Sequence, residues 1–270
     1  MRKALFQVSG GVVVLCLAVL SQAAAQEPNL SEQEIRQFLL QAKVINSRHT
    51  SNGVTSPYRL TLSDGKLTHD ASFQPIDVTQ NNAQMEGGTE PIFRDSYHFN
   101  IAAYELAKLV GLGDMMPVYV QRKWKGDYGS LSWWVPSKMD EATRKKHNIQ
   151  PPDPSAWNKQ VNKMWVFSEL VYDTDRNATN MLITEDWKLW MIDFTRAFRL
   201  NHDLFEPRNL GMCDRQLLAN LRQLKEADVL EKTKPHLTKD QVKAVMARRD
   251  KIVAIYDKRI AQEGESAVLY

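Results

Sequence analysis

A polar segment in the second half of the chain combines carboxylates with amides. It contains Asp175, Asn177 and Asn180, and Asp193 follows after a short apolar run. Phosphoryl transfer needs such a set, because one carboxylate orients the attacking hydroxyl and accepts its proton while an amide and a second carboxylate hold Mg²⁺ against the phosphates. These residue types therefore indicate a candidate site for phosphoryl transfer.

The spacing of these residues supports the same chemistry. Asn180 comes five residues after Asp175, and Asp193 comes 13 residues after Asn180. Short strands expected at 181–183 and 189–192 would form a hairpin that returns Asp193 to the side of Asn180. We expect Asp175 to orient or deprotonate the attacking hydroxyl, and Asn180 and Asp193 to bind the metal.

A structural explanation of the same segment stays open. Asp175, Asn177 and Asn180 are frequent turn formers, because their side chains bond to nearby backbone groups. The segment could therefore be a plain turn in another α+β fold. Asn177-Ala178-Thr179 also matches the glycosylation sequon, although its position in the polar loop argues against modification.

The first half of the chain predicts a mixture of helices and antiparallel strands. Ser31 and Glu34 form a capping box that starts a leading helix, and Asp64-Gly65 marks a β-hairpin. In chain order we expect this helix, a polar loop at 47–56, strands at 58–62 and 66–76, a loop at 79–90, a helix at 95–110, and strands at 118–120 and 131–135.

The second half predicts mainly helices. The segment 150–154 is rich in proline and is the expected boundary between an N-terminal lobe at 26–150 and a C-terminal lobe at 151–270. The fold class is therefore α+β, with a small mixed lobe followed by a helical lobe. Helices are expected at 155–172, 215–224 and 239–261.

The sequence Asp175-Arg176-Asn177-x-x-Asn180 and the tripeptide Ile192-Asp193-Phe194 resemble the atypical branch of the protein-kinase-like fold. That branch includes phosphatidylinositol kinases, HipA-type bacterial kinases and the secretory-pathway (Golgi casein) kinases. Residues 99–106 resemble its regulatory helix, and Phe73-Gln74-Pro75 resembles the strand that carries its nucleotide-binding lysine. The likeness covers about residues 58–200.

This resemblance implies a two-lobed protein-kinase-like fold of the α+β class, with a small mixed β/α N-lobe and a mainly helical C-lobe. It implies Mg²⁺ and ATP as cofactors. The residues that it assigns are Asp175 and Arg176 as catalytic residues, Gln74, Asn100 and Asn177 as nucleotide contacts, and Asn180 and Asp193 as metal ligands.

Two positions depart from the family pattern. The lysine that holds the phosphates and the glutamate that pairs with it are replaced by Gln74 and Asn100. A Gln–Asn pair could hydrogen-bond and hold the helix, but it would not neutralise phosphate. Glu105 lies roughly 140° around the helix from Asn100, so it cannot replace the glutamate. Arg59 or Arg196 could supply the missing cation.

Two further features each allow two interpretations. Arg196 and Arg199 follow Asp193 closely and could hold phosphate, or they could pair with Asp173 or Glu206 as framework. Trp133-Trp134 lies on an expected strand, so one ring points inward and the other outward. The pair could be ordinary core with partial exposure, or it could form a wall of a nucleotide pocket.

The first 25 residues are typical of a secretory signal. Arg2 and Lys3 precede an apolar run at 12–20 that is too short to span a bilayer, and Ala23-Ala24-Ala25 ends the segment. An uncleaved N-terminal anchor is the alternative. Cleavage after Ala25 would give an exported protein, periplasmic or secreted. No later segment of the sequence is long and apolar enough to predict a membrane span.

Charge and cysteine content narrow the function classes further. Removing the signal lowers the net charge from +3 to +1, so there is no electrostatic case for nucleic-acid binding. Cys213 becomes the only cysteine, and its apolar neighbours favour a buried structural thiol. The histidines lack metal-ligand spacing, and no G-x-S-x-G, P-loop or H-E-x-x-H motif is present. Serine hydrolases, Walker-type nucleoside triphosphatases and zinc proteases are therefore disfavoured.

The sequence leaves two main functions open. One is a Mg-ATP-dependent phosphotransferase, a kinase, whose acceptor is a protein, a lipid or a small molecule. The other is a catalytically inactive pseudokinase-like module for binding or scaffolding in the cell envelope, which the replaced Lys–Glu pair favours. A third and more general possibility is a periplasmic structural protein whose polar loop is only a turn.

Overall fold

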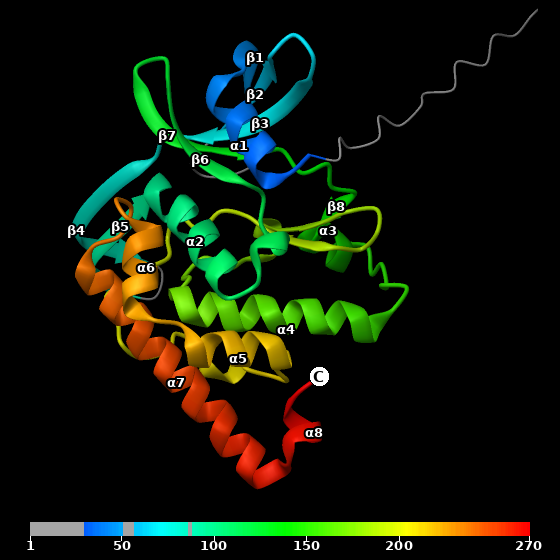
Figure 1. Cartoon of the computed structure of the whole chain (residues 1–270), viewed down its shortest axis with the longest axis vertical. Helices are drawn as coiled ribbons and strands as arrows, with labels where there is room; N and C mark the ends of the chain where they lie inside the picture. The colour runs from blue at the N-terminus through cyan, green and yellow to red at the C-terminus, as the bar shows by residue number, and fades with distance from the viewer. Residues whose placement is uncertain (1–29, 51–56, 86–87) are drawn as a thin grey trace, which may run out of the picture. The chain divides into compact units, whose positions relative to one another are not determined.

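The computed structural model describes residues 30–50, 57–85 and 88–270 (Figure 1). Ser31–Tyr270 forms one compact unit. The predicted signal at 1–25 lies outside the described residues, and so do residues 51–56 of the expected loop at 47–56. None of the helices in the described part of the chain combines the length and the apolar character needed to cross a membrane.

A five-stranded antiparallel sheet forms the core of the N-lobe, with strand order β1-β2-β3-β7-β6. Leu60, Leu62, Ala71 and Phe73 alternate along β2 and β3 and are buried on one face. The opposite face carries polar side chains, including Gln74. The strands are β1 (Lys43–His49), β2 (Tyr58–Ser63), β3 (Thr68–Gln74), β6 (Tyr119–Trp124) and β7 (Asp127–Trp133).

The expected hairpin at Asp64-Gly65 is confirmed. The Asp64 carboxylate accepts hydrogen bonds from the backbone N–H groups of Lys66 and Leu67, both at 2.8 Å. Gly65 has a φ of 90°, a conformation that glycine adopts without steric cost. This turn sets the register of β2 against β3. Gln74 is the last residue of β3 and lies at the end of the strand away from the turn.

Two of the expected loops are strands instead. Residues 47–49 belong to β1, which pairs with β2 but is mostly exposed, so its sequence lacks an apolar alternation. Residues 79–90 fall mainly in the ribbon of β4 (Asp77–Met85) and β5 (Gly88–Ser96). Residues 77–81 are exposed, which explains why the polar sequence resembled a loop.

Two helices cover the N-lobe sheet at β6 and β7. The first, α1 (Glu32–Gln41), begins at the predicted capping box and buries Phe38 against Trp133, with ring centroids 5.8 Å apart. The second, α2 (Tyr97–Leu109), starts two residues after its expected beginning because Asp95 and Ser96 still pair in β5. Its burial is close to complete along the helix, including Asn100.

A small three-stranded sheet, ordered β10-β9-β8, supports the polar loop. It consists of β8 (Met139–Asp140), β9 (Met181–Ile183) and β10 (Leu189–Met191), the last two forming the expected hairpin. Residues 134–138 connect β7 of the large sheet to β8 of this one. The lobe boundary at 150–154 stays a prediction.

The C-lobe is helical, as expected (Figure 1). Arg248, in the longest helix, is fully buried and donates to the backbone carbonyls of Leu170, Arg199 and Asn201, which ties that helix to the end of α4. Three short helices, α3, α6 and α8, were not expected, because so few residues show no clear periodicity. The helices are α3 (Glu141–Lys146), α4 (Pro154–Val171), α5 (Arg215–Gln223), α6 (Glu226–Thr233), α7 (Lys239–Glu263) and α8 (Glu265–Val268).

Candidate functional site

Arg176 is the centre of the polar loop between α4 and β9. Its side chain is 2% exposed and forms an ion pair with the equally buried Asp173, at 2.6 Å. Its remaining N–H groups donate to the backbone carbonyls of Asn180, Ile192 and Asp193 at 2.8–3.2 Å. Because a guanidinium has five N–H donors, this set uses all of its capacity and joins the loop to the end of the β9–β10 hairpin.

The predicted residues Asp175, Asn177 and Asn180 lie together at the start of this loop. Asn180 Nδ2 donates to the backbone carbonyl of Asp175 at 3.0 Å, so the five-residue spacing closes a compact turn. Asn177 caps the short helix η2 (Ala178–Asn180) by accepting from the Thr179 N–H at 2.9 Å. Its amide also donates to Asp175 Oδ1 at 3.0 Å, which orients that carboxylate.

Asp193 occupies an unusual backbone conformation at the end of the hairpin. Its φ of 55° lies in the left-handed region, which non-glycine residues rarely adopt and which concentrates at functional sites. Its carboxylate accepts from the Thr195 hydroxyl at 3.0 Å and from Gln74 Nε2 at 3.4 Å. Burial raises the pKa of the Asp193 carboxyl despite these bonds. The nearby Tyr119 phenol has a raised pKa, caused by its own burial and then by the Asp193 charge.

Gln74 and Asn100 form the expected hydrogen-bonded pair. Asn100 Nδ2 donates to Gln74 Oε1 at 2.6 Å and lies 3.1 Å from the Ser130 hydroxyl. Asn100 Oδ1 accepts from the backbone N–H of Phe194 at 2.7 Å. A neutral network therefore links β3, α2 and the residue next to Asp193. Glu105 does not replace the missing glutamate, as its position on the helix predicted, and pairs with Arg36 at 3.1 Å.

Arg196 bridges the two lobes beside this network. Its guanidinium lies 3.0 Å from Asp95, at the end of β5, and 3.3 Å from Asp175 in the polar loop. The framework interpretation expected Asp173 or Glu206 as partner. Asp173 is instead bound by Arg176, and Glu206 pairs with the exposed Arg208. Arg196 is thus already in contact with the predicted base, so it is a neighbour of the site.

A cavity of about 760 Å³ opens between the N-lobe sheet and the polar loop. It is lined by Gln74 from the sheet and by Asn180 and Asp193 from the C-lobe. Trp133 is buried and Trp134 is partly exposed, and both contribute to the wall. The two interpretations of this tryptophan pair therefore hold together, because the same rings serve the core and the cavity.

The residues at one end of this cavity fit a hard divalent cation. Asp193 offers carboxylate oxygens and Asn180 an amide oxygen, the donor type that Mg²⁺ prefers. Among the described residues, no Lys or Arg forms an ion pair with the Asp193 carboxylate within 4 Å, and the charge of Arg176 acts on it only from a greater distance. No cluster of three or more His, Cys, Asp or Glu that could hold a metal occurs in that part of the chain. A cation here would therefore take its other ligands from phosphate and water.

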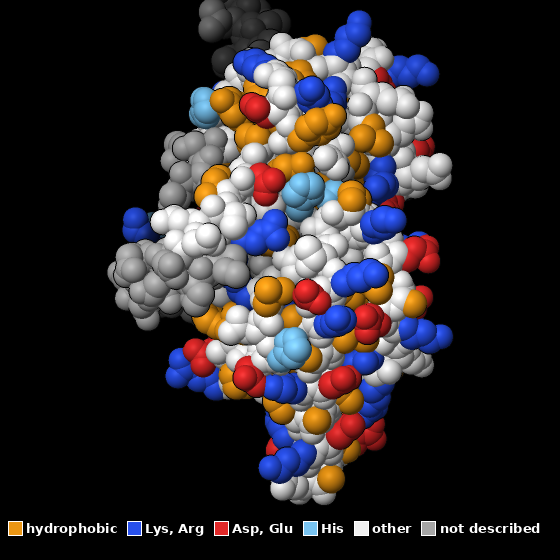
Figure 2. Space-filling view, turned by 90° about the vertical axis from the view of Figure 1, so that its left-hand side faces the viewer, with side chains coloured by type: hydrophobic (Ala, Val, Ile, Leu, Met, Phe, Trp, Pro, Cys, Tyr) orange, Lys and Arg blue, Asp and Glu red, His pale blue; other side chains and the backbone are white. Residues whose placement is uncertain are grey.

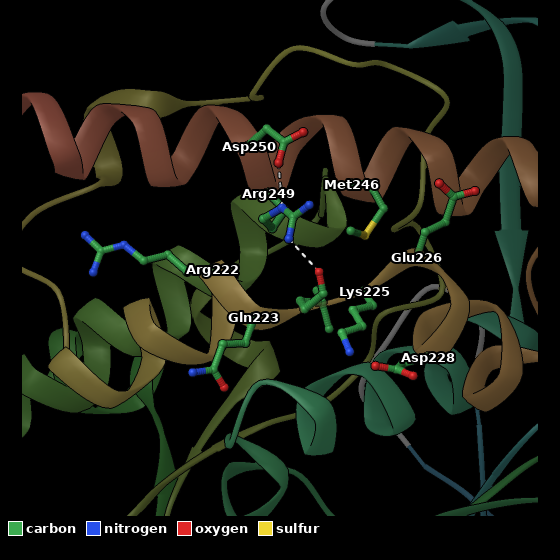
Figure 3. A pocket seen from close by; sticks show the side chains of 9 residues that line it. Arg222, Gln223, Lys225, Glu226, Asp228, Met246, Arg249 and Asp250 are labelled. Atoms are coloured by element: carbon green, nitrogen blue, oxygen red, sulfur yellow. Dashed lines mark hydrogen bonds and ion pairs between the residues drawn. The ribbon is translucent and has the colours of Figure 1, made fainter.

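A second hollow of about 880 Å³ lies on the C-lobe between α5, α6 and α7 (Figure 3). Arg249 spans it, with Nε 2.6 Å from Asp250 and a second nitrogen 2.5 Å from the Leu224 carbonyl. Arg249 and Asp250 thus pair with each other. The hollow shares no residue with the polar loop, so it contributes nothing to the chemistry considered above.

Several residues of the site escaped sequence reasoning. Ser130 and Tyr119 carry no motif, and only the fold brings them to Asn100 and Asp193. Thr195 lies two residues after Asp193, but no motif marks it as a hydrogen-bond donor to that carboxylate. Asp95 could have been suspected, because it is an acidic residue just before a helix that the sequence does predict. Its partner Arg196 lies 101 residues away, a pairing that spacing alone cannot predict.

Comparison with known proteins gives structural matches only. No protein-family model and no curated protein sequence matches the chain. The structure of hydra Fam20 with sugar has a TM-score of 0.66 and 16% identity, covering 89% of this chain and 93% of that one. The Golgi casein kinase gives 0.64 and 13%, covering 88% and 78%. The Helicobacter pylori proinflammatory kinase CtkA gives 0.50 and 9%, covering 84% and 96%.

These matches extend over most of each chain, and they agree with the arrangement of the site. The antiparallel sheet, α2, the polar loop and the hairpin before Asp193 follow one another in the order that the sequence resemblance implied. At this level of identity the likeness concerns the fold. The chain has the atypical protein-kinase-like fold, with an antiparallel β-sheet N-lobe and a helical C-lobe.

Proposed function

We propose that this chain is an exported phosphotransferase that uses Mg-ATP and acts on a hydroxyl of a protein, lipid or small-molecule acceptor. The observation that carries the proposal is the cavity in which Asn180 and Asp193 lie opposite Gln74. Among the described residues, the Asp193 carboxylate has no Lys or Arg at ion-pair distance, and a metal ion would provide a positive charge in direct contact with it.

Asp175 has the surroundings of a base for the acceptor hydroxyl. Its side chain is 36% exposed, so an acceptor can reach it from solvent. Asn177 and Arg196 each bind one of its two oxygens, which fixes the carboxylate plane.

The other residues of the loop position the reacting groups. Arg176 holds the carbonyls of Asn180 and Asp193, so the two metal ligands keep one spacing. Gln74 and Asn100 hold α2 against Phe194 and limit the movement of Asp193. When bound at Asn180 and Asp193, Mg²⁺ would supply the positive charge that phosphoryl transfer needs.

Transfer of labelled phosphate tests the proposal. The protein is incubated with labelled Mg-ATP and with panels of proteins, lipids and sugars. We expect sustained transfer that falls about 100-fold or more in Asp175→Asn, because a positioned base contributes about that much. Asp203→Asn removes a carboxylate that is exposed and outside the cavity, so it should keep the parent rate. Equal rates in Asp175→Asn and the parent would overturn the role of Asp175.

One observation favours a second candidate function. Gln74 and Asn100 are neutral and satisfy each other, so nothing at these positions attracts phosphate. A pseudokinase-like binding module would hold Mg-ATP without transferring phosphate. Calorimetric titration that detects Mg-ATP binding, lost in Asp193→Asn, together with no transfer to any acceptor, would select this second function. No heat in the parent protein would exclude both.

A further inference from the structure

Two arginines on neighbouring strands of the N-lobe sheet line the cavity. Arg48 in β1 and Arg59 in β2 are direct partners in the antiparallel register, and both line the cavity. Like charges directly opposite each other on neighbouring strands destabilise a sheet. Such a pair therefore needs a compensating negative charge close by.

Asp70 compensates only one of the two charges. Its carboxylate accepts from Arg59 Nε at 2.6 Å, and the Arg59 guanidinium stacks on Trp134 at 4.0 Å. Burial alone would raise the pKa of Asp70, but hydrogen bonds from Thr61 and Arg59 and the charges of Arg59 and Arg48 lower it. Among the described residues, Arg48 has no ion-pair partner within 4 Å.

The other acidic groups of the cavity do not reach this pair. Asp140 caps α3, with its carboxylate accepting from Thr143 N–H at 2.7 Å. Asp193 contacts Gln74, which lies two residues along β3 from Ser72, the partner of Arg59, and so about 7 Å along the strand. The Trp134 end of the cavity therefore carries an excess of positive charge, while the Gln74 position, where the family has a lysine, is neutral.

We propose that Arg48 and Arg59 form an anion-binding subsite that holds a phosphate group of the oligophosphate ligand in this cavity. The proposal rests on the proposed function for the nucleotide, but the subsite itself requires only an oligophosphate. Guanidinium groups suit this role, because their planar N–H pairs match phosphate oxygens. Arg48 on β1 and Arg59 on β2 would thus supply the positive charge that Gln74 on β3 does not provide.

Calorimetric titration with ATP, adenosine and inorganic tripolyphosphate tests the subsite, using the parent and Arg48→Gln. Arg48 is exposed, so its replacement leaves the core intact. We expect Arg48→Gln to weaken ATP and tripolyphosphate binding about tenfold, because a charged hydrogen bond is lost, and to leave adenosine binding unchanged. Lys43→Gln removes one positive charge from the same strand outside the cavity and should bind all three as the parent does.

The outcomes separate this subsite from the nucleotide function. If the parent binds tripolyphosphate but not ATP, and Arg48→Gln loses that binding, the subsite stands and the nucleotide proposal fails. If ATP binds equally to the parent and to Arg48→Gln, the subsite is overturned while the nucleotide proposal stands. An equal loss of adenosine binding in Arg48→Gln would also overturn it, since the effect would not concern phosphate.

Discussion

Arg176 and Asp193 differ in whether an oppositely charged side chain pairs with them. Arg176 is neutralised by Asp173 and uses every N–H donor on described partners. Asp193 has neutral donors and no basic side chain in ion-pair contact among the described residues. Because the cost of a buried charge is recovered only through a partner, Arg176 is framework, and the proposed cation would lie at Asp193.

We predict that Arg176→Lys destabilises the fold by about 2–4 kcal/mol. Lysine has three donors in place of five, so Asp173 and at least one backbone carbonyl lose their bonds inside the protein. Urea denaturation followed by circular dichroism measures the free energy of unfolding. Arg208→Lys changes an exposed arginine paired with Glu206 and should stay within about 0.5 kcal/mol of the parent. Similar values for the two variants would contradict the framework role.

At the scale of elements, the side chains of Asn100 and His98 on α2 form hydrogen bonds to residues of the C-lobe. Asn100 binds the backbone beside Asp193, and His98, half a turn earlier, faces His236 between α6 and α7. The two imidazole Nδ1 atoms are 2.8 Å apart, so one must donate and the other accept. Asp77 and Arg94 also act on His98, with opposite effects on its pKa, and Tyr97 stacks on its ring. The face of the molecule that carries β4, β5 and α6 is drawn in Figure 2.

We predict that this histidine pair makes stability fall in acid. Burial, followed by the charge of His98, lowers the pKa of His236 to about 4, against about 6.5 in an unfolded chain. Between these values the unfolded chain binds more protons, so the free energy of unfolding rises with pH. The contribution is complete above about pH 6.5 and is lost as the pH falls toward 4.

Thermal melts at pH 7.5 and pH 5 measure this effect. The parent should lose about 3 °C more than His236→Asn over this interval, because the variant has no such proton to take up. His147→Asn replaces an exposed histidine at the end of α3 and should behave as the parent. A steeper pH dependence in His236→Asn than in the parent would refute the assignment.

Local signals in the sequence predicted the elements, and long-range packing decided the rest. The capping box at Ser31 and the hairpin at Gly65 depend on a few neighbouring residues, so they could be predicted. Residues 77–81 of β4 are exposed, so they have no apolar pattern from which a strand could be predicted. The spacing of Asp175, Asn180 and Asp193 predicted one loop, but the carbonyls bound by Arg176 become neighbours only after the hairpin has folded.

At the scale of the whole molecule, charge is spread without a dominant sign. Acidic and basic side chains are interspersed over the face in Figure 2, in keeping with a net charge of +3 for the full sequence. A protein without a dominant surface charge attracts a charged ligand through a local cluster of charge. The excess charge at Arg48 and Arg59 is therefore more significant than the net charge of the chain.

We predict that the chain is exported and that the mature protein begins at Gln26. Cleavage after Ala25 follows from the basic start, apolar run and small residues of the first 25 positions. Expression in a bacterial host, followed by mass spectrometry of the extracytoplasmic fraction, measures the N-terminus directly. Ala23→Leu together with Ala25→Leu should block cleavage, while Ser21→Thr should not. An intact N-terminus on the exported parent would indicate an anchor instead.

Cys213 gives this protein an experimental advantage. It is fully buried, as expected, and burial raises the pKa of its thiol to about 12, so it reacts poorly at neutral pH. It is also the only cysteine in residues 26–270. Cysteines introduced at exposed positions such as Tyr128 in the N-lobe and Glu185 in the C-lobe would accept fluorescent labels selectively. The distance between the two labels would then report directly whether the lobes close when a ligand enters.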